Sequence, residues 1–87
     1  MNSSASPLVF PCDFPIKAFG SGDDFVELVI ELIGQHAPGL DTRGVRVQDS
    51  RNGRYRAVTV VVHAQSRPQL DAIYSSLSAH ERVVMAL

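Results

Sequence analysis

The feature that most constrains the fold is a change of apolar period within RYRAVTVVVHAQSRPQLDAIYSSL, residues 54–77. Up to Ala64 the apolar side chains recur at every second position, which is typical of a strand with one buried face. After Ser66 they recur at every third or fourth position, as on one face of a helix. Ser66 and Gln69 have capping-box spacing, so we expect Ser66 to cap that helix. The sequence therefore predicts a mixed sheet-and-helix domain.

The dipeptide Asn52-Gly53 just before this strand is a strong signal for a two-residue type I′ hairpin turn. A turn centred there places Arg51 opposite Arg54, and it places Asp49 opposite Arg56 as an ion pair at the rim. The pairing gathers apolar residues on one face: Val45, Val47, Val58, Val60 and Val62. The other face carries a mixed set: Arg46, Gln48, Tyr55, Ala57, Thr59, Val61 and His63. A slip of one residue would mix the two sets, so the register is well specified.

An earlier strand is predicted over residues 13–19, where apolar side chains alternate along DFPIKAF. Pro11 and Pro15 are expected to delay a regular ladder until about Ile16, because proline has no N–H to donate.

A helix should follow, because Ser21 and Asp24 fit a second capping box and apolar residues then recur at helical spacing. Pro38-Gly39 is the expected end of that helix. RVVMAL, which begins at Arg82, is the last predicted strand.

The predicted order β-α-β-β-α-β indicates an α+β fold of the ferredoxin-like class. We expect a two-layer sandwich, with a four-stranded antiparallel sheet and both helices on one face, so that the other face stays open. Residues 1–7 are predicted to be a disordered amino-terminal arm, and residues 8–87 a single domain, as suits a chain of 87 residues.

Composition excludes several classes of protein. The net charge of −1 gives no global basic field that would attract nucleic acid. No apolar run approaches the ~20 residues that span a bilayer, and the first ten residues lack the features of a signal peptide. Cys12 is the only cysteine, so no internal disulfide can form, and we expect a cytoplasmic location.

Four blocks of the sequence, in this order and spacing, resemble the YbeD-like family of small bacterial proteins: FPCDFPIKAFG, HAPG, GRYRAVTVVV and QLDAIYSSL with VVMAL. The resemblance covers about residues 10–87. It implies a ferredoxin-like fold similar to ACT domains, which are amino-acid-sensing modules. Members of the family are labelled as proposed lipoate regulatory proteins, and the resemblance carries no catalytic residues over to this chain.

The sequence shows no catalytic or metal-binding pattern. Cys12 lies beside the carboxylate of Asp13, which disfavours a reactive thiolate. His36, His63 and His80 lack the spacing of metal ligands. We therefore expect a protein that is not an enzyme and that holds no metal and no cofactor.

The first expected ligand site is the loop before the first helix, which contains Gly20, Ser21, Gly22, Asp23 and Asp24. The two aspartates disfavour a phosphate, although helix N-termini attract anions. The resemblance to ACT domains implies that this loop holds the amine or carboxylate of a small metabolite, and acidic residues suit an amine.

Arginines cluster on the predicted hairpin, with Arg46 on the strand and Arg51 and Arg54 at the tip. Two interpretations remain open. The charges could simply protect an edge strand against aggregation, or they could form a docking patch for an acidic partner.

The second expected site is the open sheet face: Phe19, Arg46, Tyr55, Thr59, Val61 and His63. RNA-binding RRM domains share this topology but stack bases on two or three aromatic side chains, and the third strand here offers one. We expect a regulatory or adaptor domain that contacts another protein or a second copy of itself, with a small metabolite as a further ligand. An RRM-like RNA-binding module is the alternative function.

Overall fold

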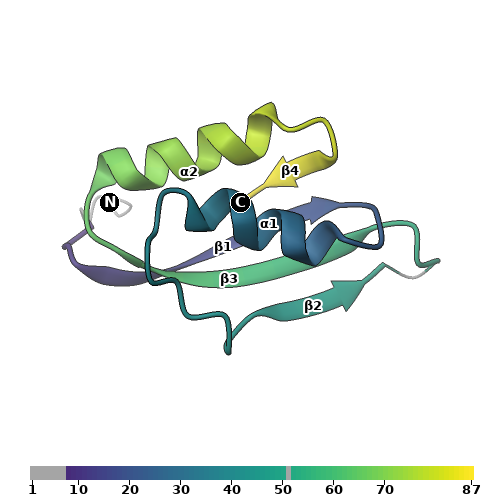
Figure 1. Ribbon diagram of the computed structural model, residues 1–87, viewed down its shortest axis with the longest axis horizontal. Coiled ribbons are helices and arrows are strands. Elements are labelled where there is room, and N and C mark those ends of the chain that lie inside the picture. The colour runs from purple at the N-terminus through teal and green to yellow at the C-terminus, as the bar shows by residue number, and fades with distance from the viewer. Residues whose placement is uncertain (1–7, 51) are drawn as a thin grey trace, which may run out of the picture.

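The computed structural model describes residues 8–50 and 52–87 and shows two layers, a four-stranded antiparallel sheet and a pair of helices (Figure 1). The elements follow in the order β1 (Cys12–Gly20), α1 (Phe25–Gly34), β2 (Arg46–Asp49), β3 (Arg56–Ala64), α2 (Arg67–Ala79) and β4 (Val83–Ala86). The sheet has the strand order β2-β3-β1-β4. Both helices cover the same face of the sheet, so the predicted ferredoxin-like, ACT-like sandwich is confirmed.

The predicted hairpin register is confirmed, but the predicted type I′ turn is wrong. Asp49 pairs with Arg56 and Val47 with Val58, as the sequence indicated. The turn is a longer loop, in which the Ser50 N–H donates to the Tyr55 carbonyl at 2.8 Å. Gly53 has a φ of +67°, whereas no described non-glycine residue has a positive φ, so Asn52 does not adopt the type I′ geometry. A two-residue turn and this longer loop are both centred between Asn52 and Gly53, so both produce the same pairing of β2 with β3.

β1 begins earlier than the prolines suggested. It starts at Cys12, and Pro15 lies within the ladder opposite Val61 of β3. Lys17 exchanges backbone hydrogen bonds with Leu87, so Lys17 and the residues two positions away along β1 direct their backbone groups away from β3. The missing N–H of Pro15 is therefore on the side away from β3 and interrupts no bond of the β1–β3 ladder.

The expected Ser21 N-cap of α1 is wrong. The helix begins at Phe25, and its N-cap residue is Asp24, whose side chain makes no capping bond. Arg82 binds both the carboxylate of Asp24 and the carbonyl of Ser21, so this loop is held by a distant side chain rather than by a capping box.

The expected end of α1 at Pro38-Gly39 is also wrong, because regular α-helix stops at Gly34. Beyond it the backbone tightens into shorter turns, in which the N–H of His36 donates to Ile33 and that of Ala37 to Gly34. In contrast, Ser66 caps α2 as predicted, because its hydroxyl accepts from the N–H of Gln69 at 3.2 Å.

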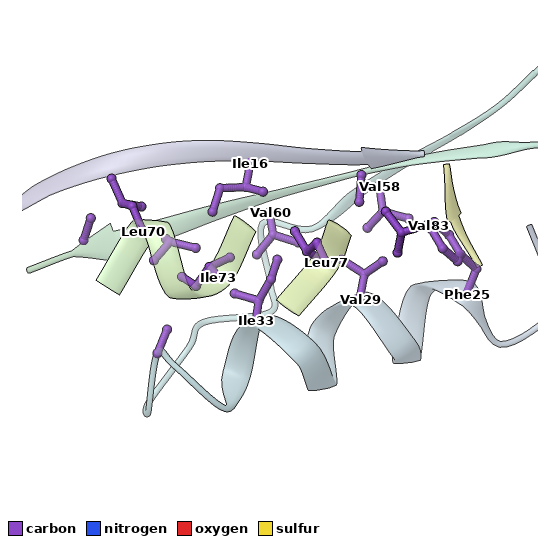
Figure 2. Close-up of a cluster of buried hydrophobic side chains, with 14 residues drawn as sticks. Ile16, Phe25, Val29, Ile33, Val58, Val60, Leu70, Ile73, Leu77 and Val83 are labelled. Atoms are coloured by element: carbon purple, nitrogen blue, oxygen red, sulfur yellow. The ribbon is translucent and has the colours of Figure 1, made fainter. Parts of the chain in front are cut away.

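The core lies between the helices and the inner face of the sheet (Figure 2). Val58, Val60 and Val62 of β3 are fully buried, as the two-residue period predicted. Val47 was placed on the same apolar face, yet it is 47% exposed. β2 is the outermost strand on its side of the sheet, and neither helix covers it in Figure 1. The remaining core residues are Ile16, Ala18, Phe25, Val29, Ile33, Ala37, Ala64, Leu70, Ile73, Leu77 and Val83.

Candidate functional site

The sheet face opposite the helices carries the residues predicted to bind a partner. Directly paired residues of neighbouring strands project to the same face, so the strand register defines rows across it. One row runs through Gln48, Ala57, Phe19 and Met85. The next runs through Arg46, Thr59, Lys17 and Leu87. We call these two rows, together with Tyr55, the central patch.

Two apolar members of the central patch come from the carboxyl-terminal segment and were missed by the sequence reasoning. Met85 is 49% exposed and Leu87 is 60% exposed. The pairing of β4 with β1 shifts register between Phe19 and Gly20. The alternation of apolar residues in VVMAL therefore could not show which side chains face away from the helices. The pairing of Phe19 with Met85 shows that Met85 lies on the open face of the sheet.

Aromatic side chains form one part of the central patch. Tyr55 is 44% exposed, and it lines a shallow hollow of about 300 Å³ together with the half-buried Phe19. The ammonium of Lys17 lies 5.9 Å from the centre of the Phe19 ring, within the range of a cation–π contact. Lys17 therefore keeps its charge at the surface, over the face of the Phe19 ring.

The middle of the central patch is positively charged. Lys17 and Arg46 are the cross-strand neighbours of Thr59 on its two sides, and they line a common hollow of about 310 Å³. Within residues 8–50 and 52–87, the arginines that make ion pairs are Arg43, Arg56, Arg67 and Arg82. Lys17, Arg46 and Arg54 make none there, so their charge is available to an outside group. Arg51 of the predicted basic tip lies outside the described residues.

His63 and Val61, also predicted as part of the binding face, lie toward the other end of β3. The Nδ1 atom of His63 is 3.0 Å from a carboxylate oxygen of Asp13, its partner on β1. A carboxylate that orients an imidazole is one half of many catalytic sites. Here both side chains are largely exposed, and the described residues that line the cavity beside them include no serine, threonine, cysteine or lysine. The pair can orient a proton, but no described residue of the cavity offers it a nucleophile.

The loop predicted to bind an amine is already in contact with a cation of the chain itself. Arg82 donates to Asp24 at 2.5 Å, and its Nε and Nη2 atoms each lie 3.2 Å from the Ser21 carbonyl. This hydrogen bond lowers the pKa of the Asp24 carboxyl and raises that of Arg82. A side chain at Gly22 would collide with the Arg82 guanidinium, 2.0 Å from the Cβ position. Asp23, which makes no ion pair among the described residues, is the remaining acidic group of the loop.

The other residues considered for chemistry have structural contacts. His36 is 2.7 Å from the Ser76 hydroxyl and so joins the turn that follows α1 to α2. His80 accepts from the backbone N–H of Arg82. Cys12 is half-buried at the start of β1 and packs against the core. Within the described part of the chain, no three histidine, cysteine or acidic side chains gather as metal ligands, and no helix is long and apolar enough to cross a membrane.

Comparisons with known proteins place this fold in a family. A family model described as "Protein of unknown function (DUF493)" matches residues 5–87. A UPF0250 protein of Azotobacter vinelandii is 46% identical over 85 residues, which cover 95% of this chain and 92% of that protein. One of Chromobacterium violaceum is 47% identical over 79 residues, covering 90% and 89%. These matches confirm the resemblance to the YbeD-like family.

The fold itself recurs in a solved structure. The solution structure of protein HP0495 from H. pylori superimposes with a TM-score of 0.74, covering 99% of this chain and 91% of that one. The two sequences are 17% identical, so this likeness concerns the fold alone.

Proposed function

The chain belongs to the DUF493 family of proteins of unknown function, and we propose that it is a non-catalytic regulatory or adaptor domain of the cytoplasm. It binds another protein through the central patch. The observation that supports this proposal is the combination of two cations, Lys17 and Arg46, with exposed apolar side chains on a sheet face that neither helix covers. Neither cation makes an ion pair with a described residue. Aromatic and apolar side chains with a charged rim are typical of protein interfaces.

The charge of the central patch favours an acidic partner over a second copy of the chain. Two copies packed face to face would bring Lys17 and Arg46 of one against the same cations of the other, and like charges in contact are destabilising. Asp13, the acidic residue of β1 on this face, already lies beside His63 at the far end. We therefore propose a partner segment that places carboxylates over Lys17 and Arg46 and apolar side chains over Phe19 and Met85.

The proposal is tested by capturing partners from the native host with the wild type and three variants, after each is shown to be folded. Arg46→Glu should slow association strongly, because it reverses a charge at the centre of the contact. Tyr55→Ala should weaken binding by more than about 1 kcal/mol. Arg67→Glu makes the same charge change on α2, outside the patch, and should leave binding unchanged.

Recovery of the same partners at equal yield with all four proteins would refute the central patch as the binding surface. Binding of single-stranded RNA is tested in a separate experiment, because Phe19 and Tyr55 line one hollow near Lys17 on which bases could stack. Micromolar binding of labelled RNA at about 150 mM salt, weakened by Tyr55→Ala, would replace the protein-docking proposal with the RNA-binding alternative.

A further inference from the structure

The two outer strands are much shorter than the two central ones. β2 pairs only with residues 56–59 of β3, whereas β3 continues to Ala64. The pairing of β4 with β1 reaches back only to Lys17, although β1 begins at Cys12. At the end where Cys12 pairs with Ala64, at the left of Figure 1, the ribbon of β1 and β3 therefore extends past both neighbours.

On the β2 side, the exposed backbone groups belong to Val61 and His63. The Tyr55 carbonyl accepts a bond from Ser50, so it faces β2. Backbone direction alternates along an antiparallel strand, so Val61 and His63 also direct their N–H and C=O groups to that side. Within the described part of the chain, neither of these N–H groups donates a hydrogen bond, and the His63 carbonyl has only a long contact of 3.5 Å with the Gln65 amide. We call these groups the β3 edge.

The equivalent gap on the opposite side of the ribbon is protected, whereas the β3 edge is not. There β1 presents Asp13 and Pro15, and proline has no N–H to offer an incoming strand. Proline is a common means of protecting a sheet edge against pairing. That side of β1 therefore keeps one outward N–H, that of Asp13, whereas the β3 edge keeps two, those of Val61 and His63.

A cavity of about 680 Å³ lies beside the β3 edge, a size within the range of small-molecule ligand pockets. Its far wall is the segment of residues 37–44 that leads from α1 to β2, and it includes the apolar side chains of Ala37 and Leu40. Among the described residues, the charged groups that line it, apart from His63, are the carboxylates of Asp13 and Asp41, and Asp41 is already paired with Arg43 at 3.0 Å. The cavity therefore combines free strand donors, an apolar wall and the carboxylate of Asp13, which lies beside His63.

We propose that the β3 edge binds an extended, cationic peptide segment of a partner protein as an added strand, antiparallel to β3 and in line with β2. Such strand addition uses main-chain hydrogen bonds for affinity and alternate side chains for specificity. Side chains opposite Val61 and His63 would face Asp13 and should be basic. The side chain between them would face Ala37 and Leu40 and should be apolar.

A second copy of this chain does not fit the gap. Its own β3 is flanked by β2 and by residues 37–44, so only a single extended strand can enter beside residues 60–64. This site is separate from the central patch, because its charge has the opposite sign and it binds backbone groups rather than a sheet face.

The first test is amide hydrogen exchange of the free protein by NMR. The N–H groups of Val61 and His63 should exchange much faster than those of Val60 and Val62, which bond to β1. Equal protection of all four would overturn the proposal, because it would show that the edge is already covered. If removal of residues 1–7 then exposed Val61 and His63, the chain's own amino-terminal segment would be the occupant instead of a partner.

The second test uses an acetylated pentapeptide amide that alternates lysine and valine. It should protect the Val61 and His63 amides, whereas the matched peptide of glutamate and valine should not. Methylating the lysine backbone nitrogens, which face β3 in the proposed pairing, should weaken binding by about fivefold or more, and methylating the valine nitrogens should not. Equal binding by the acidic peptide, or equal effects of the two methylations, would refute strand addition.

Variants of the protein complete the test. Val61→Pro removes one outward N–H without removing a bond to β1, and it should weaken peptide binding by about fivefold or more. Val61→Thr keeps that N–H and should bind within about twofold of the wild type. Peptide binding should also survive Arg46→Glu, so its result is independent of the central patch. The methylated peptides decide the question on the wild-type protein if Val61→Pro does not fold.

Discussion

Substitution of Val60 by alanine should destabilise the protein strongly, because Val60 is fully buried between β1 and the two helices (Figure 2). The change removes two methyl groups from the core, and at about 0.8 kcal/mol each their lost burial amounts to about 1.6 kcal/mol. The surrounding strands and helices can close the cavity only in part, which raises the total to about 2–3 kcal/mol. For a domain of this size, the melting temperature should fall by roughly 10–20 °C.

The matched control is Val61→Ala, the same chemical change at the next residue of the same strand. Val61 is 46% exposed on the opposite face, so little buried area is lost. Its cost should stay below about 1 kcal/mol, mostly from the weaker strand preference of alanine. Urea unfolding followed by circular dichroism measures both variants, with the slope of the transition checked for constancy. A cost below about 0.5 kcal/mol for Val60→Ala, or equal costs for the two variants, would show that the assignment of faces on β3 is wrong.

Two further predictions concern the loops. Gly53→Val should lower the free energy of unfolding in urea by more than about 1 kcal/mol, because a β-branched residue resists the left-handed backbone. Gly44→Val, at a glycine without positive φ, should lower it by less. Equal shifts of the two urea midpoints would contradict this. The Asp24 carboxyl should titrate below the ordinary aspartate range by NMR, and Arg82→Gln should return its pKa toward that range. Because its folded-state pKa is lowered, Asp24 stabilises the fold above the ordinary pKa of an aspartate and loses that effect as the pH falls through the lowered value. An Asp24 pKa unmoved by Arg82→Gln would refute the contact.

Local patterns were sufficient for the strand register but not for the turn. Asn52-Gly53 marks the centre of the hairpin, and the alternation of Val58, Val60 and Val62 permits a single register. Both a two-residue and a longer loop keep that centre. The conformation of Asn52 therefore could not be predicted from the pairing that the loop produces.

The features that could not be predicted depend on contacts between distant parts of the chain. The Ser21 capping box fits the local sequence, but the loop is held by Arg82, which follows Asp24 by 58 residues in the sequence. Asp13 and His63 come together only through the β1–β3 register, across 50 residues. Val47 follows the apolar pattern correctly, yet its exposure depends on where the helices lie over the sheet, which the period of β2 does not determine.

The two proposed binding surfaces together would fix the direction in which a partner binds. Lys17 and Arg46 give the central patch positive charge, while Asp13 gives the cavity at the β3 edge a negative charge, because Asp41 is paired with Arg43. A partner with an acidic segment and a basic extended segment could satisfy both in one orientation, and the reverse orientation would place like charges together. The two surfaces should then be thermodynamically coupled for such a partner. For two separate peptides, each of Arg46→Glu and Val61→Pro would weaken binding only at its own surface. For the intact partner, the double variant would lose more binding free energy than the sum of the losses of the two single variants.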